Sequence, residues 1–288
     1  MDELDEALQK NRTIGEATKR VYGSNYRRLL RLIGGELILP MSQDRIIKFI
    51  HQDDIPPQSQ NGMLSVVLTI RKNNGLKNDK LIKFRDTTLY NDKVADKRIK
   101  NIKLKDELPE LEDLEKYTRS LYNQEDYVGY IINFLMLRFG LRNKDLNIVI
   151  TNNQDITYVN DKSKVNYLYV TKKYVTFIRN DYKTFSTYGK QKHKIEKTLF
   201  TRAVKAVIGD EYEKPLLQLM DGDAISEESL AKVIQRNTYN GLGEGKYFKI
   251  QIHDLKKQGN IKRIRELAKS RGTDLETVFQ EYDIDNKA

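Results

Sequence analysis

The sequence KIQIHDLKKQGNIKRIRELAKSRGTDLETVFQEYD, residues 249–283, says more about the fold than any other stretch of the chain. The aromatic and β-branched residues of the run 247–252 predict a short strand that leads to His253. Lys256 follows three residues later, in a basic segment whose apolar residues recur at helical spacing over 261–268. We therefore expect a His and a Lys on one face, followed by a basic amphipathic helix.

Two further signals divide the end of this stretch. Arg271-Gly272 predicts the end of the basic helix. Thr273, with Glu276 three residues later, has the pattern of a capping box and predicts a last short helix that carries Tyr282. The His, the Lys and this Tyr thus belong to one compact part of the chain.

This arrangement resembles the C-terminal signature of the tyrosine recombinases, the phage-integrase family. There a His-x-x-Arg motif precedes a Gly-His or Gly-Trp pair, and the nucleophilic Tyr follows nine residues after that His or Trp. Here His253-Asp254-Leu255-Lys256 matches the first motif and Gly272-Thr273 the second, and Tyr282 lies nine residues after Thr273. Two positions depart from the family pattern, since Lys256 stands in place of Arg and Thr273 in place of His or Trp.

A second motif lies upstream. The run Tyr127–Phe139 is apolar on nearly all sides and predicts a buried helix that Gly140 ends. Residues 140–146, Gly-Leu-Arg-Asn-Lys-Asp-Leu, resemble the Gly-Leu-Arg-x-x-Glu-Leu box of the family. The resemblance implies that Arg142 is the first catalytic Arg and that Asp145 supports it. At a helix start, backbone N–H groups and the helix dipole would also favour a phosphate. Without the apolar helix before it and this spacing, an Arg after Gly-Leu would be a surface residue.

A lysine-rich hairpin is the third element. Runs 167–171, 174–179 and 191–196 predict strands. The family carries its catalytic Lys on the turn between the second and third strands of a small sheet, which implies Lys183 here. Other lysines of this region compete for the role or contact backbone phosphates.

The first part of the chain predicts helices over about 13–33, 42–51, 58–72 and 79–85, with apolar faces at helical spacing. This small helical domain resembles the core-binding domain that precedes the catalytic domain in the family, although any small helical bundle would give the same pattern. The predicted organisation is a DNA-binding domain over 1–87, a basic and partly helical linker over 88–107 and a catalytic domain over 108–288. The predicted fold class is mainly α with a small antiparallel β-sheet, that is, α+β.

Composition agrees with a polyanionic partner. The 51 basic residues exceed the 41 acidic ones, for a formal charge of +10, which favours double-stranded DNA. The predicted DNA contacts are Lys19, Arg20, Arg27, Arg28, Lys97, Arg98, Lys190 and Lys192. There is no Cys, which excludes disulfides and thiolate metal sites, and no apolar run is long enough to span a membrane. We expect an intracellular protein with no metal site.

The resemblance implies an enzyme that cleaves and rejoins DNA strands through a 3′-phosphotyrosyl intermediate without a metal, ATP or any other cofactor, and that self-assembles as a dimer or tetramer on paired sites. Compact integrases of mobile elements and large DNA viruses have this two-domain layout. Its implied catalytic residues are Arg142, Lys183, His253, Lys256, Thr273 and Tyr282. The alternatives are a DNA-binding relative without activity, a type IB topoisomerase and a metal-dependent DNA-processing enzyme.

Overall fold

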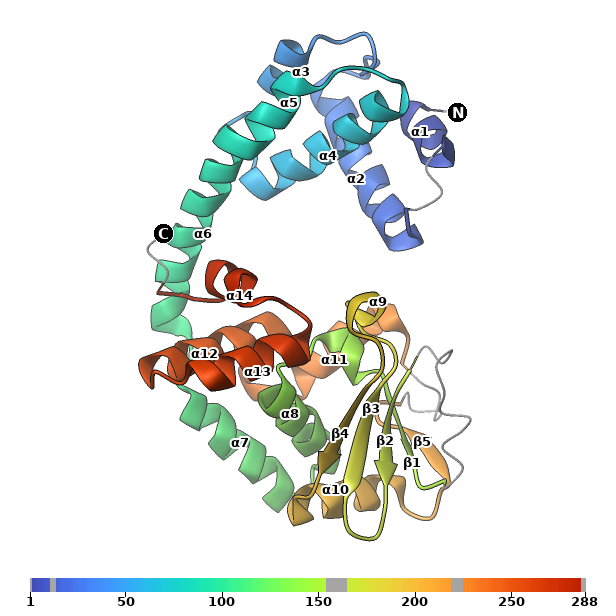
Figure 1. Ribbon diagram of the computed structural model, residues 1–288, viewed down its shortest axis with the longest axis vertical. Coiled ribbons are helices and arrows are strands. Elements are labelled where there is room, and N and C mark those ends of the chain that lie inside the picture. Colours follow the sequence, from blue (N-terminus) through green and yellow to red (C-terminus); the bar gives the residue numbers. More distant parts are fainter. Residues whose placement is uncertain (1, 11–13, 154–164, 219–224, 286–288) are drawn as a thin grey trace. The chain divides into compact units, whose positions relative to one another are not determined.

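The structure, a computed structural model, describes residues 2–10, 14–153, 165–218 and 225–285 (Figure 1). The chain divides into two compact units, 1–101 and 102–288. The first unit and the helix that leaves it contain α1 (Glu3–Lys10), α2 (Glu16–Leu32), α3 (Gln43–Ile50), α4 (Pro57–Asn73), α5 (Asp79–Phe84), the π-helical turn η1 (Arg85–Leu89) and α6 (Tyr90–Glu107).

The first unit is helical, as its apolar periodicity predicts. Helix α4 is its central element, with Met63, Val67 and Ile70 fully buried against the neighbouring helices. Ser42 caps α3 by accepting a hydrogen bond from the backbone N–H of Arg45. The predicted helices are confirmed, but α2 begins at Glu16 with Gly15 as its N-cap, later than the expected start at residue 13, which itself lies outside the described residues. The charged segment expected to be a partly helical linker is continuous helix through α6.

The second unit combines helices with a five-stranded sheet. Its elements are α7 (Leu111–Asn123), α8 (Tyr127–Phe139), the 3-10 helix η2 (Asn143–Leu146), β1 (Ile148–Thr151), β2 (Asn166–Val170), β3 (Val175–Arg179), α9 (Phe185–Tyr188), β4 (Gln191–Ile195), α10 (Thr198–Ile208), β5 (Glu213–Pro215), α11 (Glu227–Arg236), the 3-10 helix η4 (Tyr239–Gly241), α12 (Glu244–Lys257), α13 (Ile261–Arg271) and α14 (Leu275–Glu281).

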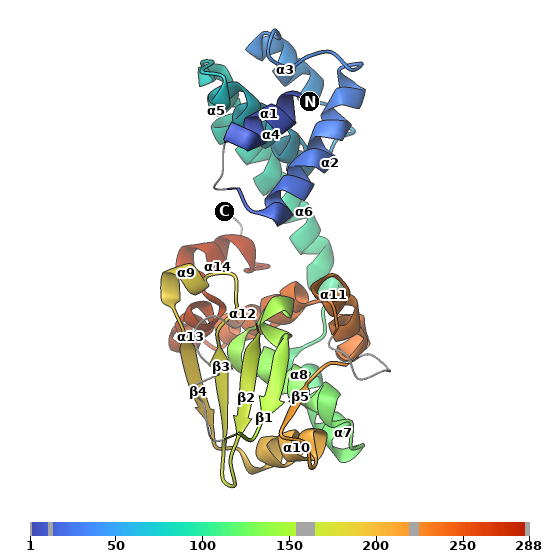
Figure 2. The same ribbon diagram turned by 90° about the vertical axis from the view of Figure 1, so that its right-hand side faces the viewer.

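The sheet has the order β4-β3-β2-β1-β5, as Figure 2 shows. Strands β2, β3 and β4 confirm the three predicted strands and pair antiparallel. The prediction of a wholly antiparallel sheet is wrong, because β1 pairs parallel with β2 and the sheet is mixed. Parallel neighbours need a crossover connection of a dozen or more residues, and the 14 residues between β1 and β2 are enough for one. The sequence analysis did not predict β1 or β5, which have only four and three residues.

One face of this sheet packs against α10, and Phe139 at the end of α8 meets Phe177 of β3 there. Because side chains alternate along a strand, Leu168 and Val170 of β2 enter this main core, whereas Tyr167 lies on the opposite face with Ile178 of β3. The class is therefore α+β, with helices forming most of the chain.

The prediction of a strand over 247–252 is wrong, since these residues form the middle of helix α12. The helix is buried on two sides. Tyr247 and Ile250 enter the main core, while Phe248 and Ile252 pack with α13 and α14. A helix covered on both sides has apolar residues at most positions, so its periodicity is indistinguishable from that of a buried strand.

The last helix also begins differently from the prediction. Asp274, not Thr273, caps α14 by accepting a hydrogen bond of 2.6 Å from the backbone N–H of Thr277. The N–H of Thr273 instead donates to Ala268 O and closes the end of α13, because Gly272 turns the chain with a φ of 66°.

Gly140, at the contact between α8 and α12, gives a direct test of how these two helices pack. Gly140 ends α8 with a φ of 60°, and a methyl group at its Cα would lie 2.8 Å from Cε2 of the fully buried Phe248. Gly259 has a φ of 67° in the same unit, but a methyl group there meets no atom within 4 Å. Gly259→Ala should cost about 1–2 kcal/mol through its left-handed backbone. Gly140→Ala should cost about 1–3 kcal/mol more through the clash. Urea unfolding followed by circular dichroism measures both, and equal costs would contradict the packing.

Candidate active site

The Arg142 segment, residues 140–146, is held by a hydrogen bond between two of its own residues. Helix α8 ends at Gly140, Leu141 is buried, and Arg142 precedes the 3-10 helix η2, as the predicted helix start requires. The Asp145 carboxylate accepts a hydrogen bond of 2.8 Å from the backbone N–H of Arg142. The carboxylate thus fixes the backbone from which the Arg142 side chain projects.

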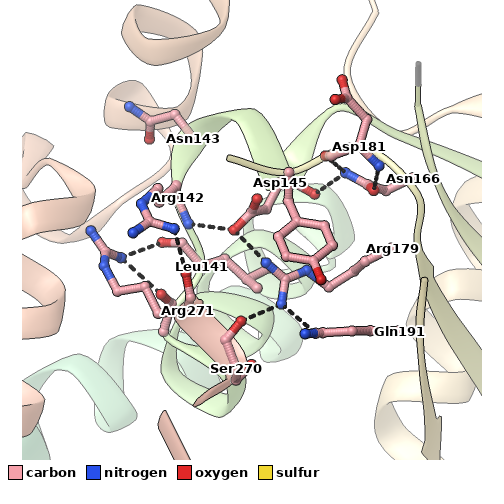
Figure 3. Close-up of polar contacts among 12 residues, drawn as sticks. Leu141, Arg142, Asn143, Asp145, Asn166, Arg179, Asp181, Gln191, Ser270 and Arg271 are labelled. Carbon is pink, nitrogen blue, oxygen red and sulfur yellow. Dashed lines mark hydrogen bonds and ion pairs between the residues drawn. The ribbon is translucent and has the colours of Figure 1, made fainter. Parts of the chain in front are cut away.

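The guanidinium of Arg142 is held at one end only. Its Nη1 donates to the backbone carbonyl of Arg271, whereas Nε and Nη2 find no acceptor among the described residues (Figure 3). Burial lowers the pKa of Arg142, and the charge of Arg271 lowers it further, against the opposing influence of Asp145, Tyr282 and Glu244. The group stays charged, because an Arg guanidinium does not lose its proton within proteins. It is therefore an oriented cation with free donors, which suits the oxygens of a phosphate.

A buried ion pair lies under this segment. Arg179, the last residue of β3, donates from Nη2 to Asp145 at 3.0 Å, and neither side chain is exposed. Arg179 also donates from Nη1 to Gln191 at 2.9 Å and to the carbonyl of Ser270. Two charges without solvent need such close pairing, although Nε of Arg179 and Oδ1 of Asp145 have no hydrogen-bond partner among the described residues. Asp145 therefore has the supporting position that the sequence predicts, with a partner that the sequence did not predict.

Asn166 joins the Arg142 segment to the hairpin. Its fully buried amide donates to the carbonyls of Asp145 and Asp181, each at 3.0 Å. Its oxygen accepts from the N–H groups of Asn180 and Asp181 at 2.9 and 3.0 Å. Residues 180 and 181 lead directly to Lys183, so this single side chain sets where the hairpin begins relative to the Arg142 segment.

Lys183 lies on the connection between β3 and β4, where the strand pattern predicts it. Its ammonium group is exposed and has no partner among the described residues. The next residue, Thr184, packs directly on Gly272, where a methyl group would lie 1.8 Å from its Oγ1. Only glycine fits at this point, and the contact brings Lys183 close to Gly272 and Thr273.

Tyr282 is the first residue after α14, the helix that follows the turn at Gly272. Its ring meets Phe248 edge to face at 4.8 Å between centroids, and the guanidinium of Arg271 lies 5.1 Å from its centroid. Its phenol is close enough to Arg142 to influence the pKa of that group. The hydroxyl has no hydrogen-bond partner among the described residues. The Arg142 side chain, the Tyr282 ring and the backbone next to Lys183 and Thr273 therefore lie around the C-terminal end of α13.

Tyr247, another tyrosine near the site, is far less available. It is 1% exposed, its hydroxyl donates to Asn133 and accepts from the N–H of Tyr239, and burial raises its pKa.

His253 and Lys256 lie elsewhere on α12. They follow Glu244, which touches the Arg142 segment, by nine and twelve residues, or ~13 and ~18 Å along the helix at ~1.5 Å per residue. His253 Nδ1 lies 2.7 Å from the Asp285 carboxylate, and Lys256 Nζ lies 2.6 Å from that of Asp283. Both predicted site residues thus pair with the chain end, and neither contacts Arg142 directly.

The predicted DNA-binding residues are spread over several elements. On α2, Arg20 and Arg27 are exposed and seven residues apart, so they share one helical face, and Lys19 and Arg28 flank them half-buried. Lys19 forms an ion pair with Glu16. Lys97 and Arg98 lie on α6, Lys190 precedes β4, and Lys192 is exposed on β4.

The sequence analysis assigned no role in the site to four residues of this region: Arg179, Arg271, Glu244 and Asn166. A charged residue at the end of an apolar run, such as Arg179 after Val-Thr-Phe-Ile, is the only local signal, and it does not name a partner. The Arg271–Glu244 pair joins helices α13 and α12 at 3.1 Å. Its members lie 27 positions apart in the sequence, beyond any helical or strand periodicity.

No protein-family model matches the chain, and no curated protein is significantly similar to it. The resemblance to the tyrosine recombinases therefore depends on the sequence motifs alone. In the part of the chain that the structure describes, no helix is both long and apolar enough to cross a membrane. Among the same residues, no three His, Asp or Glu side chains gather as a metal ligand set.

The buried ion pair makes a stability prediction. Asp145→Ala leaves the Arg179 guanidinium buried without its carboxylate, and should cost about 3–5 kcal/mol. Urea unfolding of the full chain measures this cost. Asp44→Ala is the matched control, since Asp44 pairs with Lys80 where both side chains are more than 60% exposed, and it should change little. A mild effect of Asp145→Ala would show that the pair is not dehydrated.

Proposed function

We propose that this protein is a DNA strand transferase of the tyrosine-recombinase kind, which cleaves and rejoins strands through a 3′-phosphotyrosyl intermediate. One observation carries the proposal: the half-buried guanidinium of Arg142, held at one nitrogen and free at the others, lies near the unpartnered phenol of Tyr282. A fixed cation beside a nucleophile is what attack on a phosphodiester requires.

The proposed reaction needs no group beyond protein and DNA. The Tyr282 hydroxyl releases its proton to solvent as its oxygen attacks phosphorus, a new P–O bond forms, and the bond to the 5′ oxygen breaks. Arg142 stabilises the added charge on the non-bridging oxygens, and Thr273 offers a weaker donor. Lys183 donates the proton that the 5′ oxygen takes up. The 3′-phosphotyrosyl bond conserves the energy of the phosphodiester, so a 5′-hydroxyl can reverse the step.

The substrate we propose is double-stranded DNA, held by the basic residues of α2, α6 and the β3–β4 hairpin. Strand exchange between two sites requires self-assembly of the protein on paired DNA. Such an enzyme acts inside the cell, where the DNA is.

A second candidate is a DNA-binding relative without chemistry. The observation that favours it is the pairing of His253 and Lys256 with Asp285 and Asp283, since these pairings occupy two groups that the family uses on the phosphate. Full activity would require that these carboxylates give way when DNA binds. Formation of a covalent adduct separates the two candidates.

The nucleophile is tested first. Tyr282→Phe removes only the attacking oxygen, because the ring contacts with Phe248 and Arg271 do not involve the hydroxyl. The variant should bind DNA like the wild type and form no adduct on nicked duplex DNA, as read from a denaturing gel. Tyr239→Phe is the control and should leave the adduct intact. An undiminished adduct from Tyr282→Phe would refute the assignment.

The acid is tested with a modified substrate. A sulfur in place of the bridging 5′ oxygen is a good leaving group and needs no proton. Cleavage by Lys183→Ala should therefore recover on this substrate. Arg142→Ala should stay about a hundred- to a thousandfold slow on both substrates, because its role is charge stabilisation. Rate measurements at a single turnover show the difference, and recovery of neither variant would assign the proton to another group.

A further inference from the structure

Arg271 is a charged residue with almost no exposure to water. It is 1% exposed at the end of α13, and its Nη1 donates to the carbonyls of Gly140 and Leu141 at 2.8 and 3.1 Å. Its Nη2 donates to Glu244 at 3.1 Å. A buried guanidinium is costly unless its charge is paired and its donors are bonded. Here one carboxylate pairs the charge and two carbonyls accept from Nη1, while Nε has no hydrogen-bond partner among the described residues. The two carbonyls belong to the residues that immediately precede Arg142.

The same guanidinium lies against two aromatic rings. Its Cζ is 4.5 Å from the ring centroid of Phe248 and 5.1 Å from that of Tyr282. A cation at this distance from an aromatic ring is attracted by the electrons of the ring. Phe248 closes the arrangement, since it is fully buried and meets Tyr282 edge to face. Arg271 therefore restricts where the Tyr282 ring can lie.

Arg142 depends on Arg271 as well. The carbonyl of Arg271 accepts the only hydrogen bond that the Arg142 side chain makes among the described residues. Glu244, the partner of Arg271, accepts a hydrogen bond from the N–H of Asn143 with its second oxygen. The residues before and after Arg142, its side chain and the Tyr282 ring all contact one ion pair.

We propose that Arg271, paired with Glu244, is the positioning residue of this site, which holds Arg142 and Tyr282 in register for attack. It does not touch the DNA, because its side chain is buried. This assignment rests on the proposed function.

Arg271→Lys tests the proposal, because Lys keeps the charge but lacks the planar fork that spans two carbonyls and a carboxylate. Adduct formation on nicked duplex DNA at a single turnover should slow about a hundredfold, the usual effect of misplacing a reacting group by ~1 Å. DNA affinity, measured by fluorescence anisotropy, should stay close to that of the wild type. Glu244→Gln keeps the shape of the side chain and removes its charge, and it should slow the same step. This second variant tests the proposal if Arg271→Lys does not fold.

Arg71→Lys is the matched control. Arg71 is a buried Arg that donates to the carbonyl of Met41 in the first unit. The same substitution there should leave the rate unchanged at temperatures where circular dichroism shows a folded chain. A similar slowing by Arg71→Lys would mean that Arg271 acts only through stability.

A double-mutant cycle isolates the positioning role. If Arg271 acts through Arg142, then adding Arg271→Lys to Arg142→Ala should slow the reaction much less than it slows the wild type. If the factors by which the two substitutions slow adduct formation instead multiply in full, the inference is overturned and the proposed function stays intact. No adduct from the wild-type chain on any nicked DNA would overturn both.

Discussion

The carbonyl groups at the C-terminal end of helix α13 impose the constraint on which the site depends. The last carbonyls of a helix have no partner within it, and this end of the helix dipole attracts cations. Here Ser270 O accepts from Arg179, and Arg271 O accepts from Arg142. A β-strand and the segment after α8 are thereby tied to one turn, and Gly272 leaves room for Thr184 of the hairpin to close over it.

The distribution of charge around this turn follows from burial. Arg179 and Arg271 are both buried, and each has its own carboxylate, Asp145 and Glu244. Arg142 has none, and the charge of Arg271 nearby disfavours its charged state. A region with one more guanidinium than carboxylates attracts an anion, and the free donors of Arg142 are where that anion can bind.

Local patterns predicted several of the helices, three of the five strands and part of the candidate site. The Gly-Leu-Arg box, the three strands and the order of the motifs were sufficient to expect Arg142, Asp145 and Lys183 together. They could not reveal Arg271, whose contacts with Gly140 and Leu141 join positions 131 and 130 residues apart. They also misplaced His253, because a helix covered on two sides has no apolar periodicity that distinguishes it from a strand. Periodicity reports on one element, whereas burial and charge pairing depend on several.

Identification of the residue that carries the DNA tests the account most directly. A covalent adduct on nicked duplex DNA is digested with nuclease and trypsin, and the peptide that bears nucleotide is sequenced by mass spectrometry. Cleavage after Arg271 gives residues 272–287, which contain a single tyrosine, Tyr282, among the 17 of the chain. We predict a nucleotide attached through its 3′ phosphate to Tyr282. A nucleotide on any other residue, or no adduct at all, would contradict the account.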